Sequence, residues 1–257
     1  MNNLDSYFPI LGELSLKAGA IVRRHFNSPV ELERKPDDSP VTKADREVET
    51  FLRQALEKQF PNDSIQGEEF GETKKSGAAR WIIDPIDGTK SFVLRTPLFG
   101  IMIALERDGV PALGSIYFPM QDQLLIGSEE TGTFLNGKPC AVSNTKTLAE
   151  ATLIITDPRD LYAVERSPQL QRLANSVRLV RAFGDCYGYY LVATGLADVM
   201  VEPDGLKYHD VAPLSPILKG AGGNFTDLSG KIDLANGQGL ATNQLLHQQA
   251  LAALQAE

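Results

Sequence analysis

The chain has 257 residues, of which 42% are hydrophobic and 23% are charged, so it can bury the sizeable core of a globular protein. Its formal net charge of -8 argues against a nucleic-acid-binding protein, which needs a basic surface to bind phosphates. The two cysteines, Cys140 and Cys186, form no CxxC pair and indicate neither a disulfide framework nor a zinc site.

The first 26 residues have no basic start and no long apolar run, and their pattern is typical of an amphipathic helix rather than a leader. No stretch of the sequence is apolar for the eighteen or so residues that a membrane span requires. We therefore expect a cytoplasmic protein that binds neither membranes nor nucleic acids.

Apolar residues at three- and four-residue spacing predict helices over residues 11–26 and 42–60, separated by the polar loop "ERKPDDSPVTKAD". From Trp81 to Gly137 the pattern changes to short β-rich runs that end at Gly, Pro or Asn-Gly. These runs predict a largely antiparallel sheet.

The second half alternates strands and helices: "EATLIITDP", "SPQLQRLANSV", "VRLVRAFG", "DCYGYYLVATGLA" and "DVMVEP". A helix that stops at Gly222 and Gly223, a hairpin and a last helix follow. We expect one α+β domain over residues 1–257, made of two subdomains, roughly 1–149 and 150–257, that share an interface.

The segment "WIIDPIDGT" places Asp84 at the end of a buried strand whose pairing we expect to stop at Pro85, because proline cannot donate a ladder hydrogen bond. Gly88 allows a tight turn, and Thr89 is a suitable N-cap for a helix whose free amides can hold an anion. Carboxylates and amides would then meet at one corner.

Asp84 and Asp87 would repel each other in a partly dry site unless they share a proton or bind a cation. Glu68, Glu69 and Asp210 supply further carboxylates, and a set of oxygen donors suits Mg²⁺ or Mn²⁺ rather than zinc. A lone DPxDG is more often a simple turn, so the prediction depends on these additional acids.

Three segments, "GEE" at residues 67–69, "WIIDPIDGTKSFV" at 81–93 and "HDVAPLSPILKGAGGNFTDLSG" at 209–230, resemble the signature motifs of the inositol monophosphatase superfamily in order and spacing. The segment "KPDDSPVTKADREVE" resembles the loop that closes over the metals in that family, with Lys35 and Asp38 as its charged candidates. The resemblance implies a layered αβαβα sandwich, usually a homodimer, that hydrolyses a small phosphate monoester.

The same resemblance implies two or three Mg²⁺ ions, with Mn²⁺ as an alternative. One ion would be held by Glu68, Asp84 and the backbone carbonyl of Ile86. A second would be held by Asp84, Asp87 and Asp210, and Glu68 could also face a third, weaker ion.

Catalytic roles are implied for Glu68, Thr89 and Asp45, the last two by orienting the attacking water. The amides of Gly88 and Thr89 would bind phosphate oxygens. The resemblance also allows a regulatory binding protein, but the intact set of acids favours an enzyme.

"FGDCYGYYLVATG" and "VEPDGLKYHD" resemble the histidinol-phosphate phosphatase branch more than the inositol one. Because histidinol phosphate carries an ammonium and an imidazole, Asp185 and Glu202 are candidates to bind it, with Arg181 as a further substrate candidate. Asp185 could instead cap a helix, and Glu202 could be a solvated strand end. His209 stands where the family commonly has tryptophan or tyrosine, and it could contact Asp210.

Overall fold

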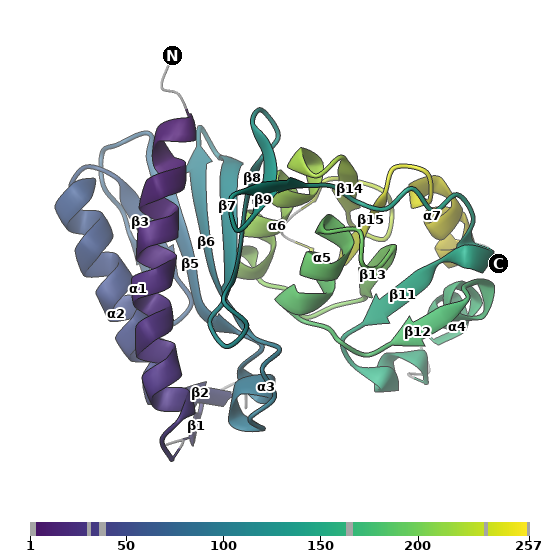
Figure 1. Ribbon diagram of the computed structural model, residues 1–257, viewed down its shortest axis with the longest axis horizontal. Coiled ribbons are helices and arrows are strands. Elements are labelled where there is room, and N and C mark those ends of the chain that lie inside the picture. Colours follow the sequence, from purple (N-terminus) through teal and green to yellow (C-terminus); the bar gives the residue numbers. More distant parts are fainter. Residues whose placement is uncertain (1–3, 30–31, 36–39, 163–166, 234–235, 256–257) are drawn as a thin grey trace.

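Figure 1 shows the computed structural model, which describes residues 4–29, 32–35, 40–162, 167–233 and 236–255. Its layers alternate along the long axis: helices, a large sheet, central helices, a small sheet and outer helices. The α-helices are α1 (Phe8–Phe26), α2 (Lys43–Gln59), α3 (Thr89–Val93), α4 (Ser167–Ser176), α5 (Cys186–Ala193), α6 (Tyr208–Gly220) and α7 (His247–Gln255). The predicted αβαβα sandwich is confirmed.

The large sheet has the strand order β10-β9-β8-β7-β6-β5-β3-β4. All neighbours are antiparallel except β3 and β5, so the predicted antiparallel sheet is confirmed, whereas β3 and β4 were not predicted. Its strands are β3 (Ser64–Gly67), β4 (Gly71–Thr73), β5 (Ala79–Asp87), β6 (Gly100–Arg107), β7 (Val110–Phe118), β8 (Gln123–Ser128), β9 (Gly132–Leu135) and β10 (Lys138–Cys140).

The small sheet has the order β12-β11-β13-β15-β14, with β11 parallel to both of its neighbours and the other pairs antiparallel. The predicted alternation and the hairpin-like pair after α6 are confirmed. Its strands are β11 (Thr152–Ile155), β12 (Leu179–Arg181), β13 (Val199–Glu202), β14 (Gly223–Thr226) and β15 (Gly239–Asn243).

The helices α1 and α2 cover the outer face of the large sheet (Figure 1) because each buries one apolar stripe. In α2 this stripe includes Val48, Leu52 and Leu56, and it also includes two acids, Asp45 and Glu49. The helix begins with Thr42 as N-cap in a capping box with Asp45, as the sequence start signal requires.

The segment predicted as a polar loop contains a small antiparallel strand pair, β1 (Leu32–Arg34) and β2 (Pro40–Thr42), so that prediction was wrong in part. The strands are three residues each, too short for an alternating pattern to stand out. The candidate Asp38 lies outside the described residues.

The predicted end of β5 at Pro85 was also wrong. Pairing with β6 is interrupted after Asp84 and resumes where Asp87 faces Gly100. The irregularity is possible because the Asp84 side chain, rather than a strand, accepts the amide hydrogen of Ile86, at 3.0 Å.

Thr89 is not the N-cap of α3, as had been predicted. Gly88 holds that position with a φ of 84°, a left-handed conformation that favours glycine. Thr89 is the first helical residue, and its hydroxyl donates to the carbonyl of Ile86 at 3.0 Å.

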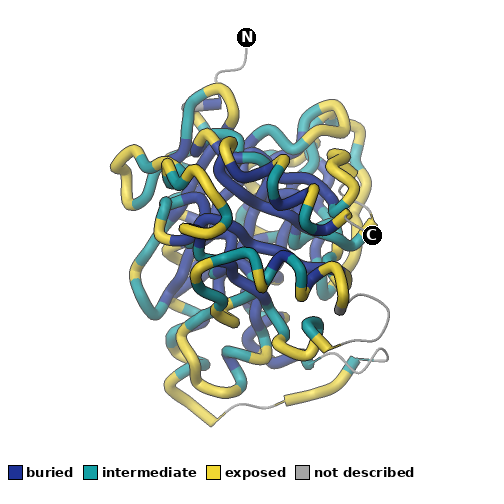
Figure 2. Tube along the Cα trace, turned by 90° about the vertical axis from the view of Figure 1, so that its right-hand side faces the viewer, coloured by how far each residue is buried: buried dark blue, intermediate teal, exposed yellow. Residues whose placement is uncertain are grey.

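The central layer of α5 and α6 lies between the two sheets, and Figure 2 shows that the interior of the molecule is buried throughout. The large sheet uses residues 64–140 and the small sheet residues 152–243. The subdomain boundary near residue 150 stays a prediction. None of the described helices is long and apolar enough to cross a membrane.

Candidate metal centre

A cavity of about 340 Å³ opens where the end of β3, the bulged end of β5, and the starts of α3 and α6 converge. Its wall contains four carboxylates beside two lysines and a histidine, and these residues come from widely separated parts of the chain. It is lined by Lys35, Glu68, Asp84, Ile86, Asp87, Gly88, Thr89, Gly205, Lys207, His209 and Asp210. The structure therefore brings the predicted metal ligands together.

Two groups of side chains in this wall have potential ligand atoms within 4.8 Å of one another. One group is Asp84, Asp87 and Asp210, and the other is Glu68, Asp84 and His209. Asp84 belongs to both groups. Two adjacent cations could therefore be held with Asp84 between them.

Backbone amides fix one oxygen of each aspartate. Asp84 Oδ1 accepts from Ile86 N at 3.0 Å, Asp210 Oδ2 accepts from Lys207 N at 2.6 Å, and Asp87 Oδ2 accepts from the Cys186 amide at the start of α5. The orientation of the three carboxylates is thus set by backbone amides before any ligand binds, by local ones for Asp84 and Asp210 and by the start of α5 for Asp87.

Burial raises the pKa of Asp84 well above its ordinary value, and the charges of Glu68, Asp87 and Asp210 raise it further. Burial and the nearby Asp185 and Asp210 likewise raise the pKa of Asp87. Carboxylates that repel one another in a dry corner favour a bound cation, and their oxygen donors suit Mg²⁺ or Mn²⁺. The residues present therefore fit the metal that was predicted.

Lys35 supplies a positive charge at the mouth of the corner. Its Nζ lies 2.7 Å from Glu68 Oε1 and 2.6 Å from Glu69 Oε1. Burial opposes the charge on Lys35, but the bonds to the two glutamates raise its pKa above the ordinary value. Glu69 is thus an ion-pair partner of Lys35, beside the potential metal ligand Glu68.

Glu49 of α2 holds the turn that presents Glu68, a role that the sequence analysis missed. Its carboxylate accepts from Glu69 N at 2.7 Å and from Phe70 N at 3.2 Å. A Cβ at Gly67 would lie 2.0 Å from Glu49 Oε1, so only glycine leaves room for this contact. An acid within the apolar stripe of α2 was the available signal.

Asp45 is buried at the start of α2, and its Oδ2 accepts from the Thr42 amide and hydroxyl at 2.8 and 2.5 Å. Its Oδ1 has no hydrogen-bond partner among the described residues. Burial raises its pKa to about 7, assisted by the charges of Glu69 and Glu68 and opposed by Thr42. Its expected contact with Thr89 stays a prediction.

Asp185 and Glu202 both lie close enough to the corner that the negative charge of Asp210 raises their pKa values. Asp185 stands at the N-cap of α5 but makes no capping bond, and a Cβ at Gly88 would lie 3.2 Å from its Oδ2. Burial raises its pKa to about 6, although Lys90 opposes this shift.

Glu202 is buried rather than a solvated strand end, with its Oε1 accepting from the Thr156 hydroxyl at 2.6 Å. Burial raises its pKa to about 8, against the effect of the Thr156 bond. The Tyr189 hydroxyl also lies at this carboxyl group and, like the Thr156 bond, opposes the rise in its pKa. Arg181, in contrast, is exposed on the edge strand β12 and donates to the carbonyl of Val180; its substrate role stays a prediction.

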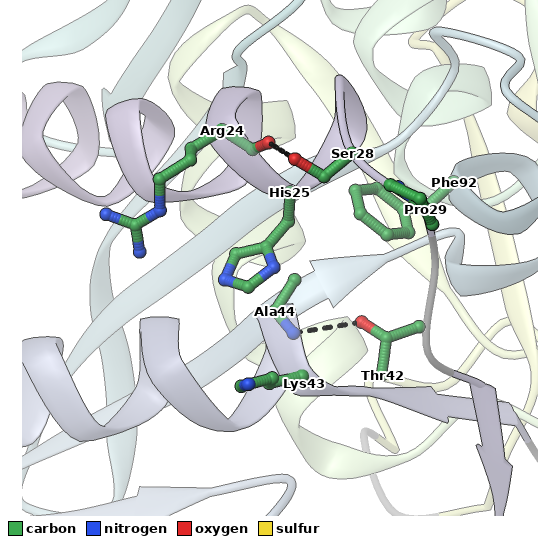
Figure 3. A pocket seen from close by; sticks show the side chains of 8 residues that line it. All are labelled: Arg24, His25, Ser28, Pro29, Thr42, Lys43, Ala44 and Phe92. Atoms are coloured by element: carbon green, nitrogen blue, oxygen red, sulfur yellow. Dashed lines mark hydrogen bonds between the residues drawn. The ribbon is translucent and has the colours of Figure 1, made fainter.

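A second cavity of about 340 Å³ lies between the end of α1, the start of α2 and Phe92 of α3 (Figure 3). Arg24 and His25 line it, but both contact the carboxylate of Glu47, Arg24 as an ion pair and His25 through Nε2 at 2.7 Å. Two of its polar side chains thus already share one carboxylate, and the convergent carboxylates make the acidic corner the better candidate site.

Comparison with known proteins matches residues 3–257 to the model of the inositol monophosphatase family. A histidinol-phosphatase of Chlorobaculum parvum is 38% identical over 94% of this chain and 94% of its own length. One of Mycobacterium tuberculosis is 35% identical over 95% of each chain. The crystal structure of the extragenic suppressor protein suhB from Bartonella henselae superposes with a TM-score of 0.90 at 28% identity and covers 98% of this chain and 99% of its own. The chain therefore belongs to the inositol monophosphatase family and is a phosphomonoester hydrolase.

Proposed function

We propose that this phosphatase converts L-histidinol phosphate and water into L-histidinol and phosphate, with two or three Mg²⁺ ions at the acidic corner. The observation that carries the substrate proposal is the position of Asp185 and Glu202. Both are shielded carboxylates near the corner, and neither forms a salt bridge with a described residue. The two relatives named histidinol-phosphatase support the same choice.

In this proposal Glu68, Asp84 and the Ile86 carbonyl hold one ion, and Asp84, Asp87 and Asp210 hold a second, with Glu68 also facing a third. The two ligand groups around Asp84 support this division. Bound Mg²⁺ lowers the pKa of water and offsets the charge that develops on the departing oxygen. Mn²⁺ could supply the same chemistry.

The protein's own groups bind the substrate and orient the water. The backbone amides of Gly88 and Thr89 would bind phosphate oxygens where the chain turns into α3. Thr89 and Asp45 would hold the attacking water, and Asp45 could accept its proton because its pKa is raised to about 7. The oxygen of the water bonds to phosphorus as the bond from phosphorus to the substrate oxygen breaks, and that oxygen takes up a proton from solvent water to give the alcohol product.

Substrate choice would depend on charge. Histidinol phosphate carries an ammonium group that Asp185 or Glu202 can pair with, whereas inositol monophosphate offers only hydroxyls. Inositol monophosphate is the second candidate because the family match is to inositol monophosphatases. The homodimer, the cytoplasmic location and a place in histidine biosynthesis remain part of the proposal.

The test is phosphate release from histidinol phosphate, inositol monophosphate and several sugar phosphates, with and without Mg²⁺. We expect Mg²⁺-dependent turnover that is highest with histidinol phosphate. Asp185→Ala and Glu202→Ala should each lower kcat/KM for histidinol phosphate far more than for inositol monophosphate. Equal losses on both substrates would contradict amine recognition by these carboxylates.

A further inference from the structure

The His209 side chain lies next to the potential metal ligands Glu68 and Asp84. One of its ring nitrogens, a carboxylate oxygen of Glu68 and one of Asp84 all lie within 4.8 Å of one another. The side chain is 14% exposed and forms part of the cavity wall. We propose that His209 is a direct nitrogen ligand of the ion held by Glu68 and Asp84, and that it shifts the preference of this site from Mg²⁺ toward Mn²⁺.

The alternative role for His209, to orient Asp210, is weaker in this structure. Its Nε2 lies 3.5 Å from Asp210 Oδ1, which is long for a hydrogen bond. Asp210 is already fixed by the amide of Lys207 at 2.6 Å. The imidazole therefore remains available for a ligand in the cavity.

Tyr208, the residue before His209 at the start of α6, anchors this part of the helix. The hydroxyl of Tyr208 is hydrogen-bonded to Glu106, and the guanidinium of Arg80 lies 5.3 Å from the centre of the Tyr208 ring. Arg80 is in turn bonded to Glu106 at 2.7 and 3.0 Å. This network limits the movement of the helix start, so that the imidazole stays beside Glu68.

A nitrogen ligand changes which ion the site favours. Mg²⁺ selects oxygen donors almost alone, whereas Mn²⁺ also prefers oxygen but is the first member of the transition-metal series along which affinity for a nitrogen donor rises. A tryptophan or tyrosine at this position would offer no such nitrogen. The inference rests on the metal centre of the proposed function and assigns it one further ligand.

The ligand role can be measured on the protein loaded with Mn²⁺ alone, without an activity assay. Electron spin echo modulation should show ¹⁴N coupling to Mn²⁺ in the wild type, and His209→Phe should remove it. His25→Phe, which removes a histidine bound to Glu47, should keep the signal. A wild-type Mn²⁺ complex without nitrogen coupling, or coupling that persists in His209→Phe, would overturn the inference.

Calorimetric titrations give a second measure. His209→Phe and His209→Gln should weaken Mn²⁺ binding by about tenfold and Mg²⁺ binding much less. Equal weakening of both ions would mean that His209 only supports the site. Phosphate release by the wild type with Mg²⁺ tests the proposed function separately. The proposed function and the ligand role of His209 can therefore fail independently.

Discussion

Asp84 is the residue on which the arrangement of the corner depends most, since both groups of potential ligands contain it. It is only 2% exposed, and three other carboxylates raise its pKa. A single buried carboxylate would simply stay protonated. Four convergent ones, three of them held by backbone amides, are better explained by cation binding.

Asp87→Asn should nearly abolish turnover. The amide keeps the size of the side chain but removes a negative charge and one potential ligand oxygen beside Asp84 and Asp210. We expect kcat with saturating Mg²⁺ to fall by at least about a hundredfold. Steady-state phosphate release measures this, with the exposed Glu13→Gln on α1 as the control. Normal rates in Asp87→Asn would refute its role as a ligand.

Glu202→Gln should change the pH dependence of stability in the metal-free protein. The pKa of Glu202 is raised from 4.5 to about 8, so its contribution to stability is present below pH 4.5 and is lost as the pH rises through about 8. Glutamine is neutral throughout. At pH 9 the variant should exceed the wild type in free energy of unfolding by on the order of a few kcal/mol, and the two should be similar at pH 5.

Urea unfolding at pH 5 and pH 9 in metal-free buffer checks this difference. Glu13→Gln serves again as the exposed control and should follow the wild type at both values. A constant offset between Glu202→Gln and the wild type would show that the carboxyl group is not titrating in this range.

At the scale of elements, α2 supports the acidic corner as well as covering the large sheet. Its buried stripe includes Asp45 and Glu49 among apolar residues. Glu49 binds the backbone amides of Glu69 and Phe70, and Arg53 donates to it at 2.8 Å. Helix and turn are therefore joined by a buried charged network.

Glu49→Gln should loosen the turn that carries Glu68. The amide nitrogen of glutamine cannot accept a backbone hydrogen bond, so one of the two amides loses its partner. We expect the Mg²⁺ concentration for half-maximal activity to rise about tenfold, with a smaller change in kcat at saturating metal.

The matched control is Glu57→Gln on the same helix, since Glu57 lies 3.7 Å from the Lys75 Nζ and is partly exposed. It should leave the metal requirement unchanged. If Glu49→Gln and Glu57→Gln raise the Mg²⁺ requirement equally, the cause is the lost negative charge on α2 and not a loosened turn.

Features set by local pattern were predictable from the sequence, and features set by distant contacts were not. The spacing of apolar residues predicted α1 and α2, and the acidic motifs predicted the corner. The contact between Lys35 and Glu68 joins residues 33 positions apart, which no local pattern reveals. The resumed pairing of Asp87 with Gly100 depends on β6, and the direction of the Asp185 side chain depends on Gly88.

At the scale of the whole molecule, α6 connects the two sheets to the acidic corner. Its first turn carries Asp210, and its body packs against β7 and β8 of the large sheet and β14 of the small one. Close packing requires glycine at the contact, because a Cβ at Gly114 would lie 2.1 Å from the carbonyl oxygen of Pro213. The position of Asp210 therefore depends on the packing of both halves of the chain.

Gly114→Ala should lower both stability and metal affinity, because the added methyl group pushes α6 away from the sheet. We expect the free energy of unfolding to fall by roughly 1–3 kcal/mol, and the rise in Tm on adding Mg²⁺ to be smaller than in the wild type. Gly12→Ala is the matched control, since its Cβ would lie an ordinary 3.6 Å from Leu124 and alanine favours the helix α1. Thermal unfolding with and without Mg²⁺ measures both effects. A destabilised Gly114→Ala with an unchanged Mg²⁺ response would show that Asp210 keeps its place independently of the packing of α6.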